Sequence, residues 1–403
     1  YMQYIKMIEE SEITFDSSKS IPHLDELVKL KSHNLNKENF VNLNRGSSPI
    51  DTNYDLSVFE DHYVMQNGSF YDICKGYMKD KRERIVKIPI VATKNFFRHE
   101  IINFHREIKI TSRLNHPSII KFIGYSPIDF NNKPRHAIIT EYASSKSLNV
   151  IMHANAYKGY WNDTKKLINI YGIAAAMKYL HDHDIIHRDL KPENIISDQN
   201  QFPKITGFNI SKEINETERS HKIKGTPAYI APEIFKNQEY SKSSDVYSFS
   251  LIIYEIMTNH KPYENITFNS INEFSTEIMK NQIRPTFSKA IPKAYKELIE
   301  KCWDEEPSQR PTFSEIVDTL KTNPNFITET VDEAAFLEYV KMIDDSVVTF
   351  NSNKRINQLM ELYKTRKHLF PKSKIKLNFG DIYHTEEFNI FNNVLRCEIF
   401  SHK

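Results

Sequence analysis

One stretch of this 403-residue chain determines which fold we predict: His187-Arg188-Asp189-Leu190-Lys191-Pro192-Glu193-Asn194. It follows Thr164 to His181, which has the apolar spacing of an amphipathic helix, and two β-branched residues, Ile185-Ile186. A polar loop whose side chains only satisfy one another is the simpler interpretation. Eight consecutive residues of these types rarely arise by accident, so we interpret the stretch as a functional loop.

These residue types suit phosphoryl transfer to a hydroxyl group. That reaction needs an oriented nucleophile and positive charge around the phosphate, and little covalent help from the protein. Asp189 can accept the hydroxyl proton, Lys191 can contact the γ-phosphate, and Asn194 can offer a neutral oxygen to Mg²⁺. We therefore predict Asp189, Lys191 and Asn194 as the catalytic group, with Asn194 as a metal ligand.

With these residues the chain resembles a eukaryotic protein kinase domain over about residues 54 to 322. Lys191 and Gly225-Thr226-Pro227 are similar to serine/threonine kinases. The tyrosine-kinase-like group is indicated by Asp245-Val246-Tyr247-Ser248-Phe249, and by Cys302-Trp303 with Arg310-Pro311-Thr312-Phe313. The resemblance implies that ATP is the cofactor and that proteins are the substrates or partners.

The resemblance also implies roles for residues outside the loop. Lys87 is where the family keeps the lysine that holds the α- and β-phosphates, and Glu107 is where it keeps the ion-pair partner. By itself, a lysine near a helix glutamate is usually a surface ion pair. The other positions implied for the nucleotide site are Gly68, Ile73, Ile85, the gatekeeper Thr140, and Glu141 and Ala143 of the hinge. The positions implied to be structural are His187, Arg188, Phe208, Thr226, Glu233 (paired with Arg310), Asp245 (bracing the catalytic loop) and Arg310.

The metal-binding triplet departs from the family pattern. Asp-Phe-Gly is expected after the predicted strand Pro203 to Thr206, and the chain reads Gly207-Phe208-Asn209. The missing carboxylate is the group that holds Mg²⁺ against the β- and γ-phosphates. Asn194 is a neutral ligand, and Mg²⁺ is usually held by one or two carboxylates. Glu193 or Asp198 remain as possible replacements.

Three further departures fall in the same region. The phosphate-covering loop keeps only Gly68 of its glycines within the run 66–73, and glycines there allow the backbone to approach phosphates closely. Ile85 replaces a small alanine, which narrows the adenine pocket. Thr111 is polar where the family usually stacks an apolar residue. All these changes weaken one site.

Two main interpretations follow. The first is a pseudokinase, a nucleotide-binding or scaffold module with negligible transfer, in which ATP binds without depending on a metal. The second is an active serine/threonine kinase with an altered metal mode, supported by the intact group Lys87, Glu107, Asp189, Lys191 and Asn194. In that case, Thr217 and Ser220 are candidate phosphorylation sites that pair with Arg188.

Composition excludes other classes of function. The 54 Lys and Arg residues nearly balance the 52 Asp and Glu residues, so a nucleic-acid binder with a broad basic face is not expected. No apolar stretch is long enough for a membrane span, and no secretory signal is visible. Three widely spaced cysteines fit a reducing compartment, so we expect a cytoplasmic protein. Abundant Asn, Lys and Ile favour a eukaryote with an AT-rich genome.

The chain contains one internal repeat. Residues 1–31 align without gaps onto residues 336–366, and 14 of the 31 positions are identical, including Tyr4/Tyr339 and Ile8/Ile343. One interpretation is a duplicated helical flank that packs on the middle domain. The other is a link in an array of tandem kinase-like modules within a longer chain. The similarity fades after residue 366, so 367–403 do not visibly begin a second module.

We predict an α+β, bilobal protein-kinase-like fold. A smaller lobe, 54–143, should hold an antiparallel sheet and a helix from Asn95 to Leu114. A larger, mainly helical lobe, 144–322, should bury Cys302 and Trp303. The flanks 1–50 and 326–403 should be helical and packed in part on the kinase-like domain.

Overall fold

The computed structural model describes residues 54–68, 71–90, 98–143, 146–157, 159–214, 223–287 and 290–346. Within these ranges, no helix is both long enough and apolar enough to cross a lipid bilayer. The N-terminal flank and residues 347–403 lie outside them, so the predictions for these segments stay predictions.

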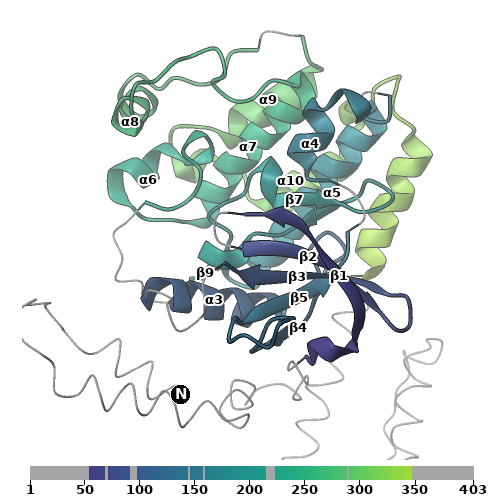
Figure 1. Ribbon diagram of the computed structural model, residues 1–403. Helices are drawn as coiled ribbons and strands as arrows, with labels where there is room; N and C mark the ends of the chain where they lie inside the picture. Colours follow the sequence, from purple (N-terminus) through teal and green to yellow (C-terminus); the bar gives the residue numbers. More distant parts are fainter. Residues whose placement is uncertain are drawn as a thin grey trace, which may run out of the picture.

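A five-stranded antiparallel sheet forms the smaller lobe (Figure 1). Its spatial order is β1-β2-β3-β5-β4. The strands are β1 (Phe59–Asn67), β2 (Tyr71–Met78), β3 (Glu83–Pro89), β4 (Phe122–Ser126) and β5 (Ala137–Glu141). One face carries a small apolar core that includes Cys74, Val86 and Ile139. Because side chains alternate along a strand, the residues between these project to the opposite face.

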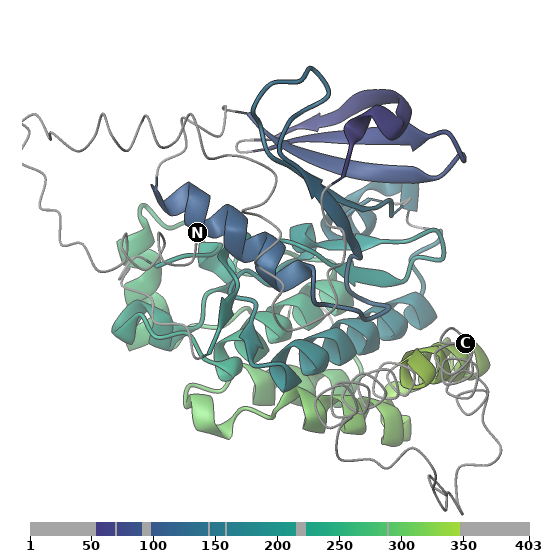
Figure 2. The same ribbon diagram turned by 90° about the horizontal axis from the view of Figure 1, so that it is seen from below.

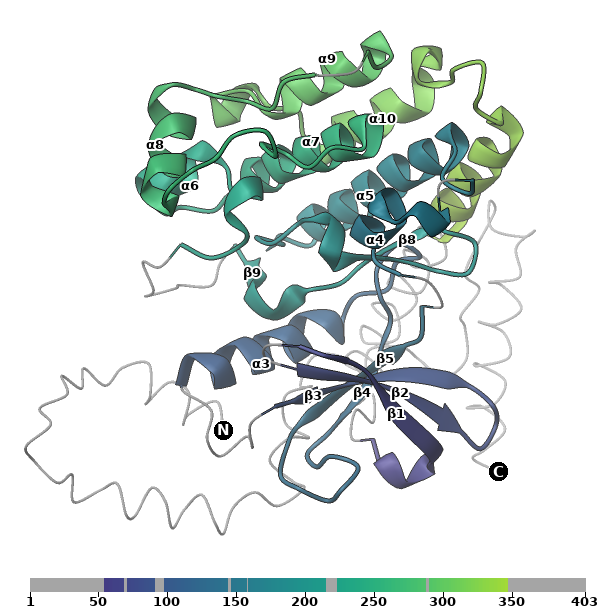
Figure 3. The same cartoon turned by 45° about the horizontal axis from the view of Figure 1, so that its top comes forward.

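One helix accompanies this sheet and reaches the larger lobe. α3 (Arg98–Thr111) lies beside the sheet in Figures 1 and 3, and it packs against the 3₁₀ turn Phe208–Ile210. The predicted helix Asn95 to Leu114 is therefore somewhat shorter at its C-terminal end, and residues 91–97 lie outside the described ranges. A side chain on this helix can therefore lie at the boundary between the two lobes.

The larger lobe is mainly helical, as predicted, and lies on the other side of the boundary (Figure 3). Its helices are α4 (Leu148–His153), α5 (Asp163–Asp182), α6 (Pro232–Asn237), α7 (Lys242–Thr258), α8 (Ile271–Lys280), α9 (Lys293–Cys302) and α10 (Phe313–Thr322). Short two-stranded ladders pair β6 (Ile185–Ile186) with β9 (Lys212–Glu213), and β7 (Ile195–Ser197) with β8 (Pro203–Ile205). The bilobal α+β prediction is confirmed.

Local sequence explains where the main helices begin. The side chain of Asn162 caps α5 by accepting a hydrogen bond from the Lys165 amide, and Thr312 with Glu315 forms a capping box at α10. α5 and α7 are buried around most of their circumference, which is the pattern of a helix in the centre of a lobe. The predicted helix from Thr164 to His181 is present, but the prediction that it is amphipathic is wrong, because other elements cover it on most sides. Cys302 and Trp303 are buried as predicted, at 0% and 8% exposure.

Candidate functional site

One face of the small-lobe sheet gathers the predicted nucleotide residues. Ile73 pairs with Lys87 across β2 and β3, and Ile85 pairs with Thr140 across β3 and β5. Partners in register project to the same face, so these four side chains share one surface. It is the face opposite the Cys74 and Val86 core. The alternation of side chains along the strands thus places the predicted nucleotide residues on one face of the sheet.

Lys87 forms the predicted ion pair across this surface. Its Nζ lies 3.2 Å from Oε1 of Glu107, which α3 supplies, and 3.4 Å from Oγ1 of Thr206. The Glu107 side chain is 4% exposed and that of Lys87 is 18% exposed. The pair therefore sits in a partly desolvated place where Coulombic attraction is stronger than at the surface. Thr111 directs its hydroxyl to the Glu107 carbonyl at 2.7 Å, so the polar group there is satisfied within the helix.

The catalytic loop brings its three predicted residues together with Thr226. Asn194 donates from Nδ2 to the Asp189 carbonyl at 2.7 Å and to Asp189 Oδ2 at 2.9 Å. Thr226 donates to Asp189 Oδ1 at 3.1 Å, and Lys191 Nζ donates to Thr226 Oγ1 at 2.6 Å. Lys191 Nζ is also 3.3 Å from Asp189 Oδ2. A carboxylate held in this way has a fixed orientation toward an incoming hydroxyl.

Asp245, at the start of α7, braces the loop as the resemblance implies. Its carboxylate accepts hydrogen bonds from the amides of His187 at 2.9 Å and Arg188 at 3.0 Å, and it lies 2.9 Å from His181 Nε2. This support allows Arg188 to hold a positive φ of 70°, which non-glycine residues seldom adopt. The catalytic loop is thus held by the carboxylate of Asp245, a residue that is 1% exposed.

His187 connects the loop to the segment around Gly207. Its Nε2 lies 2.9 Å from the Thr206 carbonyl, and its ring contacts Phe208 edge-on with centroids 5.1 Å apart. Burial lowers the pKa of His187, although Asp245 and Asp189 oppose this effect. The neutral ring donates from Nε2 to the carbonyl and accepts from the Asp189 amide at Nδ1, at 3.3 Å.

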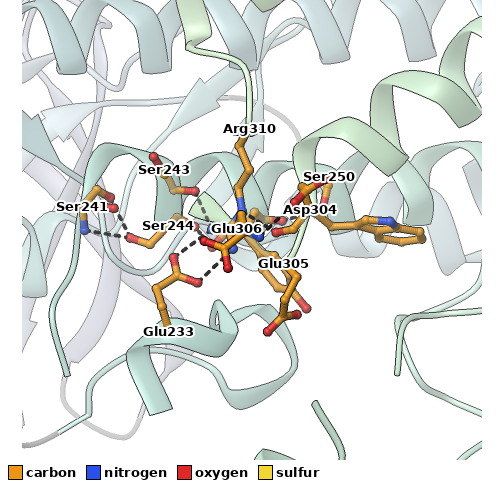
Figure 4. Close-up of polar contacts among 12 residues, drawn as sticks. Glu233, Ser241, Ser243, Ser244, Ser250, Asp304, Glu305, Glu306 and Arg310 are labelled. Carbon is orange, nitrogen blue, oxygen red and sulfur yellow. Dashed lines mark hydrogen bonds and ion pairs between the residues drawn. The ribbon is translucent and has the colours of Figure 1, made fainter. Parts of the chain in front are cut away.

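A buried ion pair joins α6 to the residues that precede α10 (Figure 4). Arg310 makes two bonds to the carboxylate of Glu233 in α6, at 2.8 and 2.9 Å, and its side chain is 0% exposed. The guanidinium also donates to the carbonyls of Ser243 and Asp304. Two parallel bonds fix the geometry of the pair. The structure thus contains the implied pairing of Glu233 with Arg310.

The residue at the family's metal position has no carboxylate. Gly207 has φ 86° and ψ 38°, the left-handed conformation, and it begins the turn Phe208–Ile210. A Cβ added there would lie 2.6 Å from Cγ and 2.7 Å from Oδ1 of Asn194. The Asn194 side chain therefore fills the space in front of Gly207. Its amide nitrogen donates to Asp189. Neither Gly207 nor Asn194 has a carboxylate that could anchor Mg²⁺.

Of the two acidic residues considered as replacements, Asp198 is engaged elsewhere. Asp198 Oδ1 accepts from the amides of Asn200 and Phe202 in the turn between β7 and β8. Glu193 is exposed. In the described ranges, no group of three or more His, Cys, Asp or Glu side chains could hold a metal ion. The family holds its metal ions with an aspartate and the catalytic-loop asparagine, and position 207 offers no aspartate, so the donor set does not fit that arrangement.

Gly68 is kept for a local structural reason. A Cβ at this residue would lie 2.5 Å from the carbonyl oxygen of Tyr71, to which the Gly68 amide donates at 3.0 Å. The connection between β1 and β2 therefore requires a residue without a side chain. Residues 69 and 70, in the middle of this loop, lie outside the described ranges.

The hinge follows β5. Thr140 is 5% exposed and its hydroxyl donates to the Glu141 carbonyl at 3.2 Å, while the Glu141 carboxylate bonds Lys204 at 2.8 Å and the Lys121 amide at 2.9 Å. Ala143, also predicted, is buried at 8%. The Glu141 side chain thus ties the hinge to β8, and only its backbone could meet an adenine.

Lys75 is a cleft-face residue that the sequence analysis missed. It pairs in register with Ile85, and its Nζ lies 3.9 Å from the centroid of Tyr142 and 2.7 Å from Glu83. Burial opposes its charge, but hydrogen bonds to Glu83, Tyr142 and Tyr77 outweigh burial and raise the pKa of Lys75. Side chains alternate along a strand, so Lys75, two residues after Ile73 in β2, could have been placed on the same face from the sequence.

This fold and this site define a protein kinase: a lysine–glutamate pair under a small sheet, a braced catalytic loop and the buried pair of Glu233 and Arg310. The protein kinase domain profile matches residues 59–320, so the chain belongs to the protein kinase domain family. Members of the family use ATP, generally with Mg²⁺.

Its relatives include kinases from distant eukaryotes. It is 30% identical over 273 residues to the dual specificity protein kinase shkC of Dictyostelium discoideum, covering 64% of this chain and 50% of that protein. It is 33% identical over 258 residues to the probable serine/threonine-protein kinase drkB of the same organism, covering 63% and 35%. Against the serine/threonine-protein kinase CTR1 of Arabidopsis thaliana it is 32% identical over 239 residues, covering 59% and 28%. The chain thus matches half or less of the length of these relatives.

Proposed function

We propose that this chain is a pseudokinase, a nucleotide-binding signalling module of the tyrosine-kinase-like group that works by binding other proteins. The observation that carries the proposal is Gly207, which stands in a left-handed turn against Asn194 where the family supplies a carboxylate. Without that carboxylate, the charge on the β- and γ-phosphates lacks its principal metal anchor. Three widely spaced cysteines support a reducing setting, and the proposal places the module in the cytoplasm.

In this proposal, ATP binds through protein groups alone. Lys87, positioned by Glu107, would contact phosphate oxygens, and the backbone from Glu141 to Ala143 would meet the base. The test is a thermal-shift titration of the whole chain with ATP, with and without Mg²⁺ and Mn²⁺. We expect a stabilisation by ATP of the same size in all three conditions. A shift that requires metal would contradict the proposal, and no shift at all would exclude nucleotide binding.

A second function is supported by one observation, the ordered group of Asp189, Lys191 and Thr226. In an active serine/threonine kinase, Asp189 would take the proton of the attacking hydroxyl while Lys191 neutralises phosphate charge. The hydroxyl oxygen would bond to the γ-phosphorus and the bond to the leaving ADP oxygen would break. Sustained phosphorylation of protein serine or threonine by the purified chain, abolished in Asp189→Asn, would establish this function and reject the first.

A further inference from the structure

A helix outside the kinase profile is built into the large lobe. Residues 333–346 are helical, and Phe336, Tyr339, Val340 and Ile343 are buried, between 1% and 4% exposed. Their spacing of three, four and seven residues places them on one face of the helix. In all three views of the fold, this yellow-green helix lies beside α5 (Figures 1, 2 and 3).

Tyr339 fills a pocket that is shaped for a tyrosine. Its ring packs against Phe202 with centroids 4.5 Å apart and contacts Tyr171 edge-on at 6.3 Å. Its hydroxyl shares a 2.8 Å hydrogen bond with Ser118 Oγ, so the buried polar end has a partner. We call the surface formed by Ser118, Tyr171, Gly172, Phe202 and Pro203 the tyrosine groove.

The lack of a side chain at Gly172 makes the tyrosine groove deep enough for the side chain of Tyr339. A Cβ on this residue would lie 2.6 Å from Pro203 Cγ and 3.1 Å from Tyr339 Cζ, and it would collide with the Tyr339 hydroxyl. A glycine in the middle of a helix lowers helix stability, so its presence in α5 has a packing reason. The tyrosine groove therefore combines a glycine floor, an apolar wall and a hydroxyl partner.

The N-terminal repeat carries a second set of the same contact residues. With the shift of 335, Tyr1, Tyr4, Ile5 and Ile8 occupy the positions of Phe336, Tyr339, Val340 and Ile343. Glu9 occupies the position of Asp344, which forms an ion pair with Lys321 on the lobe. Residues 1–11 thus contain the aromatic, aliphatic and acidic groups that this surface recognises.

We propose that residues 1–11 are a docking segment whose partner is the large lobe of another protein kinase domain. That partner must keep a glycine at the position of Gly172 and a hydroxyl at the position of Ser118. Tyr339 already fills the tyrosine groove of this domain, so both segments cannot occupy it at once. The chain then connects two kinase lobes, one through residues 1–11 and its own through residues 333–346. This role does not depend on whether the cleft is active.

The proposal can be tested within the whole chain, because an emptied tyrosine groove becomes a partner surface for residues 1–11. The replacement Tyr339→Ala removes the ring from the groove and weakens the hold of helix 333–346 on the lobe. Residues 1–11 of the same or another molecule, which carry the full set of contact residues, should then displace that helix and fill the groove. We expect Tyr4→Ala to leave the unfolding temperature unchanged in the parent chain and to lower it by several degrees in the Tyr339→Ala chain. Met7→Ala is the matched control, because its counterpart Met342 is exposed at 38%.

Two results would overturn the proposal. Tyr4→Ala could lower the unfolding temperature equally with and without Tyr339, or it could have no effect in either chain. If Tyr339→Ala does not fold, the milder Tyr339→Leu chain, whose shorter side chain leaves the Ser118 end of the groove open, is mixed with a synthetic peptide of residues 1–15 that carries a photo-crosslinking phenylalanine at position 4. Crosslinks on Phe202 or Tyr171, at least tenfold more than in the parent chain, would support docking. Equal or no crosslinking there would reject it.

Discussion

The side chain of Asn194 lies against Gly207 so closely that a Cβ on Gly207 would be 2.6 Å from Asn194 Cγ. The two residues thus share one small volume in front of the phosphate region. Asn194 is held there by two hydrogen bonds to Asp189. Restoring a carboxylate at position 207 therefore changes the packing of the catalytic loop as well as its charge.

The replacement Gly207→Asp should create a metal-dependent nucleotide site at a cost in stability. The left-handed φ of 86° and the crowding by Asn194 should lower the free energy of unfolding by about 1–2 kcal/mol. In return, ATP with Mg²⁺ at 100 times its Kd should stabilise the variant by about 2.7 kcal/mol. Thermal unfolding with ATP, with and without Mg²⁺, measures both effects.

The control for this variant is Gly207→Ala. It carries the same backbone strain and a similar crowding but no carboxylate, so it should lose stability without gaining a metal response. If Gly207→Asp shows no difference between ATP alone and ATP with Mg²⁺, the lost carboxylate is not what separates this cleft from a metal-binding one.

The replacement Glu233→Gln should strongly destabilise the large lobe. It leaves the guanidinium of Arg310 buried without a counter-charge, and removing one partner of a buried pair costs about 3–5 kcal/mol. Chemical denaturation of the whole chain measures this loss. Glu297→Gln is the matched control, because Glu297 pairs with Lys293 where both side chains are more than half exposed, and such pairs contribute about 0–1 kcal/mol. Equal losses in the two variants would contradict the structural role of Arg310.

Stability should fall in mild acid, in part because of His116. Burial lowers the pKa of this ring to about 3, and its Nδ1 accepts from the Ser118 amide at 3.1 Å. The folded ring stays neutral while the unfolded one gains a proton below about pH 6.5, so the unfolded state binds more protons and stability is lost as the pH falls from 6.5 toward 3. At pH 5 the expected loss is about 2 kcal/mol.

His116→Asn tests this assignment, because asparagine keeps an acceptor for the Ser118 amide and cannot titrate. The difference between parent and variant at pH 8 measures packing alone. Between pH 8 and pH 5, the parent should lose about 2 kcal/mol more than the variant. Parallel curves would show that His116 does not contribute to acid sensitivity.

The general fold could be predicted because its signals are local and numerous. The predicted strand Pro203 to Thr206, the predicted helix Thr164 to His181 and the catalytic loop each specify a known element, and the structure has all of them. The predicted strands and α5 agree with the structure to within about two residues, a usual uncertainty for element ends. The Glu233–Arg310 pair joins residues 77 apart in sequence, and only the family resemblance implied it.

Other features depend on packing between distant segments, and no local pattern reveals them. The engagement of Asp198 in a turn, the filling of the Gly207 space by Asn194 and the position of Lys75 over Tyr142 are of this kind. The repeat in the sequence marked residues 336–346 as special, but not the pocket that Tyr339 fills. Side-chain volumes and hydrogen-bond partners across the fold decide these cases.

Gly172→Ala should show how closely the tyrosine groove fits its ligand. The added methyl group would meet Pro203 and Tyr339, and overpacking a core costs about 1–3 kcal/mol, of which the better helix propensity of alanine returns about 1 kcal/mol. In a Tyr339→Phe background the hydroxyl that suffers the worst collision is gone, so the same replacement should cost less. A double-mutant cycle measured by denaturation gives this coupling. Gly159→Ala is the control, because a Cβ there meets nothing within 4 Å and stability should hardly change. If Gly172→Ala changes the free energy of unfolding as little as Gly159→Ala does, the absence of a side chain at residue 172 is not what allows Tyr339 to bind in the groove. Binding of Tyr339 must then depend on the hydrogen bond to Ser118 and on the contacts with the aromatic side chains.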